Sequence, residues 1–229
     1  MVKLRSTINK FFKTKLFGKE INFINSPKEP SYVQNRVRRI KAKEPETIFW
    51  IKYIPTEDIL FDVGANIGIY TMAAGARGIT TYAFEPHAGN YNILCQTISS
   101  NPFPCTAYCV ALSDAPAFDI IGIKNYYPGV SDNIISKTQK HKHGVIVKDL
   151  DTLVETNVLP QPQHMKIDID GHEARFYEGA KKTLAKCKSI LFEIENQHTY
   201  IVEDLKKQGF KLRGTFLRNA TEANYVFSK

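Results

Sequence analysis

The chain has a repeating pattern of hydrophobic positions from residue 59 onward. Short apolar runs predict buried strands, and segments whose apolar residues recur every three or four positions predict helices that cover them. The expected strands are 59–63, 80–84, 106–112, 118–123, 145–147, 165–169, 189–194, 210–216 and 223–227. The expected helices are 47–53, 67–74, 89–98, 173–184 and 200–208.

This alternation indicates the fold class. Repeated β-α-β units imply parallel strands joined by right-handed crossovers. The last two strands, 210–216 and 223–227, leave no room for a helix between them, so one of them runs antiparallel. We therefore expect an α/β, Rossmann-like, mostly parallel sheet with an antiparallel C-terminal strand.

The N-terminal segment has a different pattern. Apolar residues in 4–17 lie at helical spacing with lysines and arginines between them, which predicts a short basic amphipathic helix. Such a helix lies on an anionic membrane surface, binds a partner groove or packs its apolar stripe on the domain. Gly18 and the proline-containing stretch 26–30 then indicate a linker. We expect an arm and linker over 1–43 and a single domain over 44–229.

Charge supports this division. The 229 residues carry a net charge of +8, and residues 1–43 hold 12 of the 31 lysines and arginines but only two of the 23 acidic residues. A basic arm favours an anionic partner. The composition, with 43% hydrophobic and 24% charged residues, is that of a globular protein.

Cysteine usage and the first residues predict the compartment. The four cysteines are too few and too scattered for a disulfide framework. Residues 1–17 never build a continuous apolar core, so we expect no signal peptide and a cytoplasmic protein, peripheral to the membrane if the arm binds lipid. We expect no metal site, since His141 and His143 stand in a lysine-rich loop without a nearby carboxylate.

The loop after the first expected strand carries the clearest chemistry. It reads Asp-Val-Gly-Ala-Asn-Ile-Gly over 62–68, and its glycines allow a tight turn and a close approach by a ligand. Glu85 follows Gly64 by 21 positions, at the end of the second strand, where a carboxylate accepts hydrogen bonds from ribose hydroxyls. The alternative is an ordinary strand–helix turn with a capping glutamate.

The loop also distinguishes between cofactors. A dinucleotide fingerprint requires a glycine where Asn66 stands, so that pyrophosphate can lie against bare backbone. Asp62 would repel a pyrophosphate but suits the ammonium of a methionine moiety. The pattern therefore favours S-adenosylmethionine over NAD.

Four motifs in order resemble the FkbM-type methyltransferases: residues 61–68 (FDVGANIG), 84–86 (FEP), 111–114 (ALSD) and 166–173 (KIDIDGHE). Gly179-Ala180 and residues 191–194 continue the resemblance, which covers about 57–195. It implies a class I S-adenosylmethionine fold and methylation of a hydroxyl, often on a saccharide. One departure is Asp170, where the family usually has glutamate.

The resemblance implies the cofactor site. Asp62 and the loop would hold the methionine end, Glu85 the ribose, and Asn90 would support that side. Ser113 and Asp114 would border the adenine. The expected cofactor-binding residues are Asp62, Gly64, Ala65, Asn66, Gly68, Glu85, Pro86, Asn90, Ser113, Asp114 and Asp168.

The fourth strand carries the candidates for catalysis. Lys166, Asp168 and Asp170 alternate, so their side chains share one face, where polar groups are costly unless paired or functional. Transfer of a methyl group to a hydroxyl needs a base for its proton. The candidates are Asp168, Asp170, His172 and Glu173; the alternative is a Lys166–aspartate ion pair with Glu173 in the first turn of a helix.

An acceptor pocket is expected over 115–149, where Tyr126 and Tyr127 could stack on a sugar and 129–133 offers hydrogen-bonding groups. Glu195, Asn196 and His198 could also face the acceptor. We therefore expect an O-methyltransferase that acts on a saccharide or glycolipid. The alternatives are an NAD-type oxidoreductase, disfavoured by Asp62 and Asn66, and a protein that binds or methylates nucleic acid through the basic arm.

Overall fold

The computed structural model describes residues 11–25, 30–123, 134–135 and 141–229. Its centre is a seven-stranded sheet in the order β12-β13-β11-β10-β3-β4-β5. The strands are β3 (Ile59–Val63), β4 (Thr80–Phe84), β5 (Cys105–Tyr108), β10 (His164–Ile167), β11 (Ser189–Glu195), β12 (Lys211–Leu217) and β13 (Glu222–Ser228). Neighbouring strands from β5 to β11 pair in parallel, while β13 is antiparallel to both β11 and β12. The expected fold class is confirmed.

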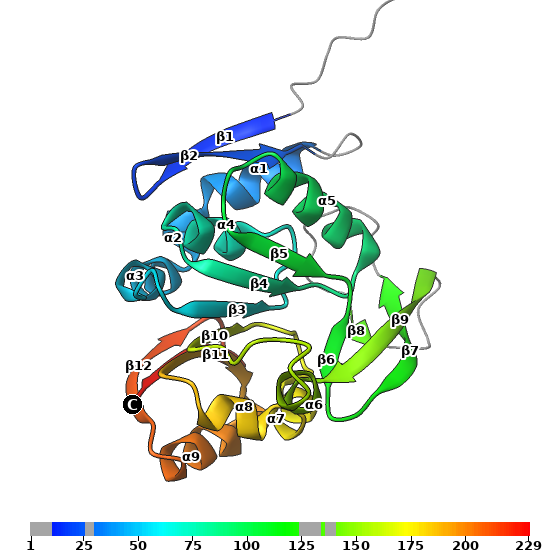
Figure 1. Cartoon of the computed structure of the whole chain (residues 1–229), viewed down its shortest axis with the longest axis vertical. Helices are drawn as coiled ribbons and strands as arrows, with labels where there is room; N and C mark the ends of the chain where they lie inside the picture. Colours follow the sequence, from blue (N-terminus) through cyan, green and yellow to red (C-terminus); the bar gives the residue numbers. More distant parts are fainter. Residues whose placement is uncertain (1–10, 26–29, 124–133, 136–140) are drawn as a thin grey trace, which may run out of the picture.

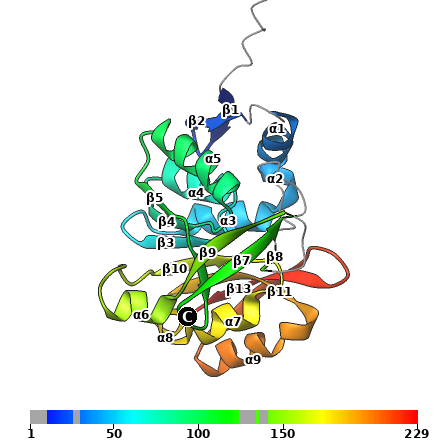
Figure 2. The same ribbon diagram turned by 90° about the vertical axis from the view of Figure 1, so that its right-hand side faces the viewer.

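Helices cover both faces of this sheet (Figures 1 and 2). The helices that follow β3 in the chain are α4 (Ile69–Ala76), α5 (Ala88–Ser99), α6 (Leu150–Glu155), α7 (Glu173–Glu178), α8 (Lys181–Ala185) and α9 (Tyr200–Lys207). Alternation along β3 separates the two cores: Phe61 and Val63 pack in a cluster with residues of α7, α8 and α9, whereas Leu60 packs in a cluster with residues of α4. The expected helix 173–184 is divided at Gly179 and Ala180 into α7 and α8. Gly179 lies so close to the backbone of Ser113 that a Cβ there would be 1.9 Å from the carbonyl oxygen of Ser113.

The N-terminal expectation is wrong where the structure describes it. Residues of the expected basic helix form β1 (Phe11–Leu16), which pairs antiparallel with β2 (Lys19–Ile24). Phe17 and Gly18 both have positive φ, 48° and 80°, which is the conformation of a two-residue hairpin turn. The hypothesis of membrane contact depended on that helix; residues 1–10 lie outside the described part.

The expected boundary at residue 43 also disagrees with the packing. Helices α1 (Pro30–Arg38), α2 (Ile40–Lys43) and α3 (Pro45–Tyr53) follow the hairpin. Buried Leu16, Ile21, Val33 and Ile40 belong to the same core cluster as Met72 of α4. Burial of apolar area drives this association, so the described part of 1–43 belongs to the domain rather than to a separate arm.

A second, smaller sheet stands beyond the carboxyl ends of the central strands (Figure 1). It contains β6 (Ala111–Ser113), β7 (Ala117–Ile123), β8 (Ile134–Ile135) and β9 (His141–Asp149) in the order β6-β9-β7-β8. The expected strand 106–112 is thus divided between two sheets. The expected strands 118–123 and 145–147 pair as β7 and β9. Tyr126, Tyr127 and 129–133 lie outside the described residues.

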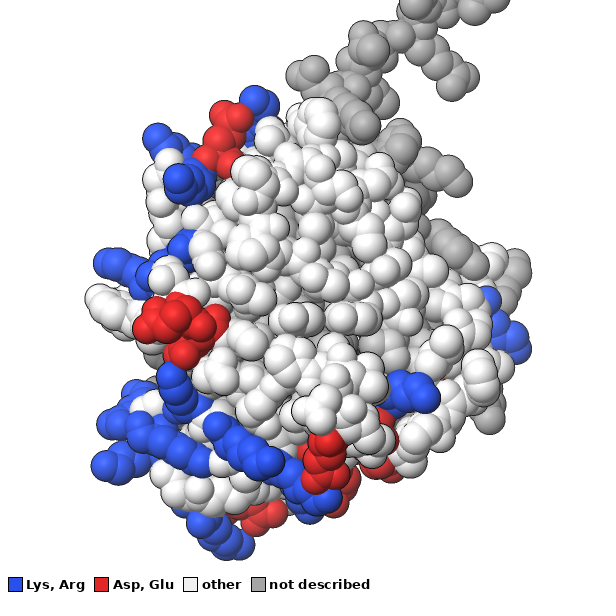
Figure 3. Space-filling view, viewed as in Figure 1, with Lys and Arg blue, Asp and Glu red and all other residues white. Residues whose placement is uncertain are grey.

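The surface of one face is uneven in charge. Figure 3 shows lysine and arginine side chains gathered at the lower left, on the side of the C-terminus. Several lysines on this part of the chain form ion pairs: Lys206 with Glu203, Lys207 with Asp204, and Lys188 with Asp58. Among the described helices, none is long and apolar enough to cross a membrane.

A buried polar network joins the amino-terminal ends of β10 and β11. Asp58 Oδ2 lies 2.9 Å from His164 Nε2, and His164 Nδ1 lies 2.7 Å from Ser189 Oγ. Trp50 Nε1 donates to the same Ser189 oxygen, and Lys188 Nζ donates to Asp58. These hydrogen bonds give partners to polar side chains that are buried at this end of the sheet.

Replacing Asp58 with asparagine is expected to lower the free energy of unfolding by about 1–3 kcal/mol, because His164 loses its charged partner while it stays buried. Chemical denaturation of wild type and D58N measures the change. Glu57→Gln removes a charge from the neighbouring, exposed position and serves as the control. Equal stabilities of D58N and E57Q would contradict a structural role for the network.

Candidate active site

A cavity lies at the carboxyl ends of the central strands. Its walls come from the loops after β3, β4 and β10, from the segment between β5 and β7, and from α1, α2, β11 and the β12–β13 turn. The lining residues are Arg36, Lys43, Val63, Gly64, Asn66, Phe84, Glu85, Pro86, His87, Asn90, Val110, Ala111, Leu112, Ile121, Asp168, Ile169, Asp170, His172, Glu193, Arg218 and Glu222. This is the position where ligands bind in open α/β sheets.

The loop after β3 brings bare backbone to the cavity. Gly64 has a φ of 80°, and a Cβ at this position would lie 1.8 Å from the carbonyl oxygen of Asp168. The Gly64 and Ala65 amides donate to the carbonyl of Phe84. Asn66 has a φ of 52°, which asparagine tolerates better than most residues. Only glycine at position 64 lets the loops after β3 and β10 come this close.

Glu85 follows β4 directly and holds the loop from the other side. Its Oε2 accepts from the Asn66 amide at 2.7 Å, and its Oε1 accepts from the His87 amide at 2.9 Å. The Asn90 side chain also hydrogen-bonds it. Burial raises the pKa of Glu85 to about 7, against the opposing effect of these hydrogen bonds. The carboxyl group therefore titrates near neutral pH.

Asp62 does not line the cavity, contrary to the expectation of direct contact with a ligand. Its Oδ2 accepts from Thr71 Oγ1 at 2.6 Å, which ties β3 to α4, and burial raises its pKa. Its Oδ1 has no hydrogen-bond partner among the described residues. Asp62 lies within β3, one residue before the strand ends, so it stands behind the loop that lines the cavity. Its role toward a cofactor stays a prediction.

Charged residues toward the carboxyl ends of β10 and β11 form a paired network. Lys166 Nζ lies 3.0 Å from Asp168 Oδ2 and is almost wholly buried. Burial alone would lower the pKa of Lys166 and raise that of Asp168, but their mutual attraction outweighs it, so the pKa of the lysine rises and that of the aspartate falls. The Lys166–aspartate ion pair weighed from the sequence is therefore present.

Arg218 extends this network to the N-terminal helices. Its Nε donates to Glu193 at 3.1 Å, its Nη2 to Glu44 at 3.1 Å, and its Nη1 to the carbonyl of Lys43. Burial and the charge of Asp168 raise the pKa of Glu193 to about 9. Arg218 thus closes one end of the cavity by joining the β12–β13 turn to the N-terminal helices.

Asp170 and His172 bring two further polar groups to the cavity. Asp170 has a φ of 39°, a strained conformation for a residue other than glycine. Burial lowers the pKa of His172, and the positive charge of Arg175 lowers it further. His172 Nε2 is buried and has no hydrogen-bond partner within the described structure. A neutral imidazole therefore stands in the wall of the cavity at neutral pH.

Other expected site residues lie outside the main cavity: Ala65, Gly68, Ser113, Asp114 and Glu173. Ala65 lines a small neighbouring pocket with Lys166 and Asp168. Ser113 donates to Asp114, which ion-pairs with Arg175 of α7, so these two residues anchor a helix. The residues just before them, from Val110 to Leu112, line the cavity instead.

Sequence reasoning missed the basic residues Arg36, Lys43 and Arg218. The first two stand in the segment 1–43, for which the sequence predicts an arm and linker, whereas the structure places them on the successive helices α1 and α2. Arg218 stands in the polar turn between the last two strands, and only the antiparallel position of β13 beside β11 brings it to Glu193. No local sequence pattern identifies Arg218 as a residue of the cavity.

The sequence is similar to those of known methyltransferases. The sequence model of the Methyltransferase FkbM domain matches residues 62–221. The hexuronic acid methyltransferase AglP of Haloferax volcanii is 24% identical over 162 residues, which are 69% of this chain and 65% of that protein. The chain thus spans a little under two thirds of the curated relative.

Solved structures agree on the fold. A methyltransferase FkbM from Methylobacillus flagellatus KT superposes with a TM-score of 0.52 at 12% identity, covering 87% of this chain and 59% of that one. Streptococcus pneumoniae Sp1610, a putative tRNA (m1A22) methyltransferase in complex with S-adenosyl-L-methionine, gives 0.51 at 15% identity, covering 80% and 72%. The fold is that of the class I methyltransferases.

Proposed function

Because the chain belongs to the FkbM family of methyltransferases, we propose that it transfers the methyl group of S-adenosylmethionine to a hydroxyl of a saccharide. The observation that carries the proposal is one continuous cavity that extends from Glu85, a ribose-binding carboxyl group, to the neutral His172. The cofactor would supply an electrophilic methyl group. The chain has to bind the cofactor, align the acceptor and take up the acceptor's proton.

Cofactor binding is assigned to the loops after β3 and β4. The Glu85 carboxylate would accept from the ribose hydroxyls, and the backbone of residues 64–66 would hold the methionine portion. The apolar side chains of Val110 and Leu112 line the same cavity as Pro86 and would hold the adenine. Gly64 lets this loop lie against the loop after β10, because a Cβ at position 64 would lie 1.8 Å from the carbonyl oxygen of Asp168. The loop thereby lines the same cavity as the Glu85 carboxyl group, an acceptor suited to ribose hydroxyls.

We assign proton uptake to His172 rather than to Asp168. A general base must be unprotonated and free to accept, and the Asp168 carboxylate is stabilised by Lys166 at 3.0 Å, which makes it a weak base. The imidazole of His172 is kept neutral by burial. An acceptor hydroxyl that donates to Nε2 would also satisfy this buried nitrogen. Asp168 and Asp170 then orient the acceptor and the cofactor.

A saccharide acceptor is supported by the name of the Haloferax relative, a hexuronic acid methyltransferase. The cavity is lined in part by charged side chains, among them Arg36, Asp170 and Glu222, which suit the many hydroxyl groups of a sugar. The wall thus offers polar groups for a saccharide as well as apolar side chains, such as Val110 and Leu112, for an adenine.

Calorimetric titration with S-adenosylmethionine, with NAD as the parallel ligand, tests the cofactor. Transfer of labelled methyl from the cofactor to a panel of hexuronic acid glycosides and neutral hexosides tests the acceptor class. Micromolar binding of S-adenosylmethionine alone and labelling of a saccharide hydroxyl are expected. Binding of NAD instead of S-adenosylmethionine would support the oxidoreductase alternative. Labelling of nucleic acid alone would refute the saccharide acceptor.

Replacing His172 with glutamine is expected to lower kcat at least about 100-fold and to leave the affinity for S-adenosylmethionine nearly unchanged, because the base acts on the acceptor's proton. The wild-type rate should fall only at pH values below the ordinary histidine pKa of 6.5, since burial lowers the pKa of His172. Steady-state kinetics against pH measure both effects. His141→Gln, a change at an exposed residue of β9, is the control. An unchanged kcat in H172Q would assign the base to another residue.

A further inference from the structure

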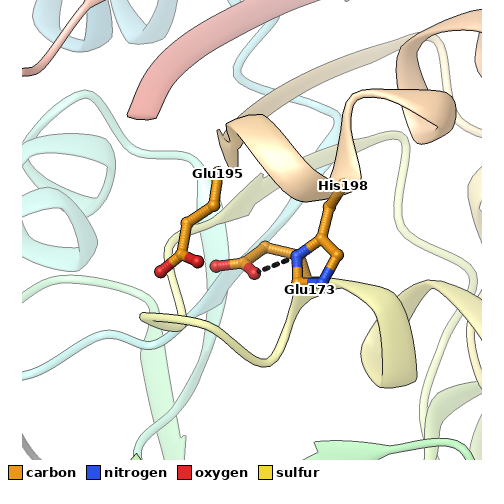
Figure 4. Close-up of side chains that lie close together, drawn as sticks. All are labelled: Glu173, Glu195 and His198. Atoms are coloured by element: carbon orange, nitrogen blue, oxygen red, sulfur yellow. Dashed lines mark hydrogen bonds and ion pairs between the residues drawn. The ribbon is translucent and has the colours of Figure 1, made fainter. Parts of the chain in front are cut away.

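Beyond the cavity, three metal-ligating side chains converge from separate segments. Glu173 begins α7, Glu195 ends β11, and His198 stands in the short 3-10 helix Asn196–His198. Figure 4 shows the two carboxylates facing each other and the imidazole turned toward Glu173. One ligand atom from each residue lies within 4.8 Å of the other two. From this geometry we propose that Glu173, Glu195 and His198 bind a divalent transition-metal ion.

The distances suit one shared ion. Glu173 Oε2 and His198 Nδ1 are 2.9 Å apart. Two ligand atoms bound to the same ion at about 2.1 Å lie roughly 3 Å from each other when they are neighbours in its coordination shell. The pair therefore already has the separation that coordination requires. The ligand atom of Glu195 lies within 4.8 Å of the other two, so it needs to move by about 2 Å or less, within the reach of a glutamate side chain.

The surrounding structure orients the ligands. Glu173 is 2% exposed, and its Oε1 accepts from the Gly171 amide at 2.8 Å, which leaves Oε2 to the site. Gly171 has a φ of 82°, so the loop can turn this amide toward Glu173 without strain. Gln197 Nε2 donates to Glu195 Oε2, which leaves Oε1 to the site. Outer hydrogen bonds of this kind fix metal ligands in place.

The carboxylates of the cluster have little cationic support from the protein. Within the residues that the structure describes, no lysine or arginine forms an ion pair with Glu173 or Glu195, and the partner of buried Glu173 is the imidazole of His198, which is charged only when protonated. A second carboxylate group, Asp168, Asp170 and Glu193, also has its ligand atoms within 4.8 Å of one another. Lys166 and Arg218 form ion pairs with two of its three members. The cluster around Glu173 is thus the one that has no lysine or arginine partner in the described structure.

The donor set indicates the class of ion. One imidazole nitrogen and two carboxylate oxygens suit Zn²⁺, Co²⁺ or Mn²⁺, whereas Mg²⁺ and Ca²⁺ prefer oxygen ligands throughout. Three protein ligands leave further coordination positions open. Because Glu173 directly follows His172, the ion would lie behind the wall of the cavity and fix the loop that carries Asp170 and His172.

The test uses the full chain, purified and treated with a chelator. Titration with Zn²⁺ by calorimetry should give one binding event per chain, and Co²⁺ should give the visible absorption of a nitrogen-ligated ion. Binding should raise the thermal midpoint by a few degrees. His198→Ala and Glu195→Gln should each weaken binding at least about tenfold. None of these readouts depends on an acceptor or on methyl transfer.

Glu193→Gln tests the neighbouring carboxylate group as the matched control. Binding that is retained in E193Q and weakened in H198A and E195Q supports the site. Binding that is lost in E193Q but retained in H198A would place the ion in the other group and overturn the proposal. Absence of binding in wild type would also overturn it, and would make the Glu173–His198 contact a structural link between α7 and the 3-10 helix.

Discussion

Replacing Glu85 with alanine is expected to weaken the binding of S-adenosylmethionine about 100-fold or more. A carboxylate that accepts from two ribose hydroxyls contributes about 1.5–3 kcal/mol per hydrogen bond, and about 1.4 kcal/mol corresponds to a tenfold change in Kd. Glu85 also holds the amides of Asn66 and His87 at 2.7 and 2.9 Å, so its loss frees the loop that the cofactor lies against. Calorimetric titration of wild type and E85A measures the effect.

The same carboxyl group predicts a pH dependence. Burial raises the pKa of Glu85 to about 7 from 4.5, so in the free protein it is mostly protonated at pH 6 and mostly ionised at pH 8. Because the ionised form accepts both ribose hydroxyls, affinity should rise about tenfold over this interval. The stability that the neutral group contributes is complete below pH 4.5 and is lost as pH rises through about 7.

Two observations would contradict this role. One is a cofactor affinity that changes with pH in E85A as it does in wild type. The other is an affinity in E85A within threefold of that of Glu203→Ala, which removes an exposed glutamate of α9. Circular dichroism of E85A has to match that of wild type, so that a loss of binding is not a loss of fold.

Replacing Gly64 with alanine is expected to lower the free energy of unfolding by about 3 kcal/mol or more and to abolish cofactor binding. The new Cβ would lie 1.8 Å from the carbonyl oxygen of Asp168 and 2.8 Å from its carbon, in backbone that cannot yield without moving β10. A φ of 80° adds the cost of a left-handed conformation, about 1–2 kcal/mol for a residue with a Cβ. Chemical denaturation of wild type and G64A measures the total loss of stability from the close contact and the backbone conformation.

Gly78→Ala separates the two costs. Gly78 has a φ of 88°, close to that of Gly64, but a Cβ there meets nothing within 4 Å. G78A should therefore lose only about 1–2 kcal/mol for its backbone conformation. If G64A and G78A lose the same stability, the close approach of the loops after β3 and β10 does not limit the choice of residue at position 64.

The sequence predicted most of what local patterns encode. Runs such as 59–63 and 80–84 predicted their strands, and the distance from Gly64 to Glu85 predicted that both would meet at one edge of the sheet. The last strand pair predicted the antiparallel β13. These inferences succeeded because strand period, glycine loops and crossover handedness depend on neighbours in the chain or on general rules of sheet topology.

The features that the sequence did not predict have a common physical cause. Each depends on contacts between residues that are far apart in the sequence. The apolar residues of 11–16 fit a helical spacing as well as an alternating one. These residues form a strand because they pair with β2, and the hairpin packs on the core. Ser113 and Asp114 lie outside the lining of the cavity, and Asp114 forms an ion pair with Arg175 of α7, a contact that the family motif does not predict. Arg218 contacts Glu44 and Glu193, both far from it in the sequence.

The hairpin of β1 and β2 lies outside the segment that the family model matches, yet it packs on the core of the domain. The recognisable family segment begins at residue 62, but Asn22 exchanges hydrogen bonds with Asn101, and the Ile24 amide donates to Thr97 at the end of α5. Arg36 and Lys43, which follow the hairpin, complete the cavity wall. The segment that the family model matches is therefore smaller than the unit that packs together in this structure, and part of the cavity wall comes from outside it.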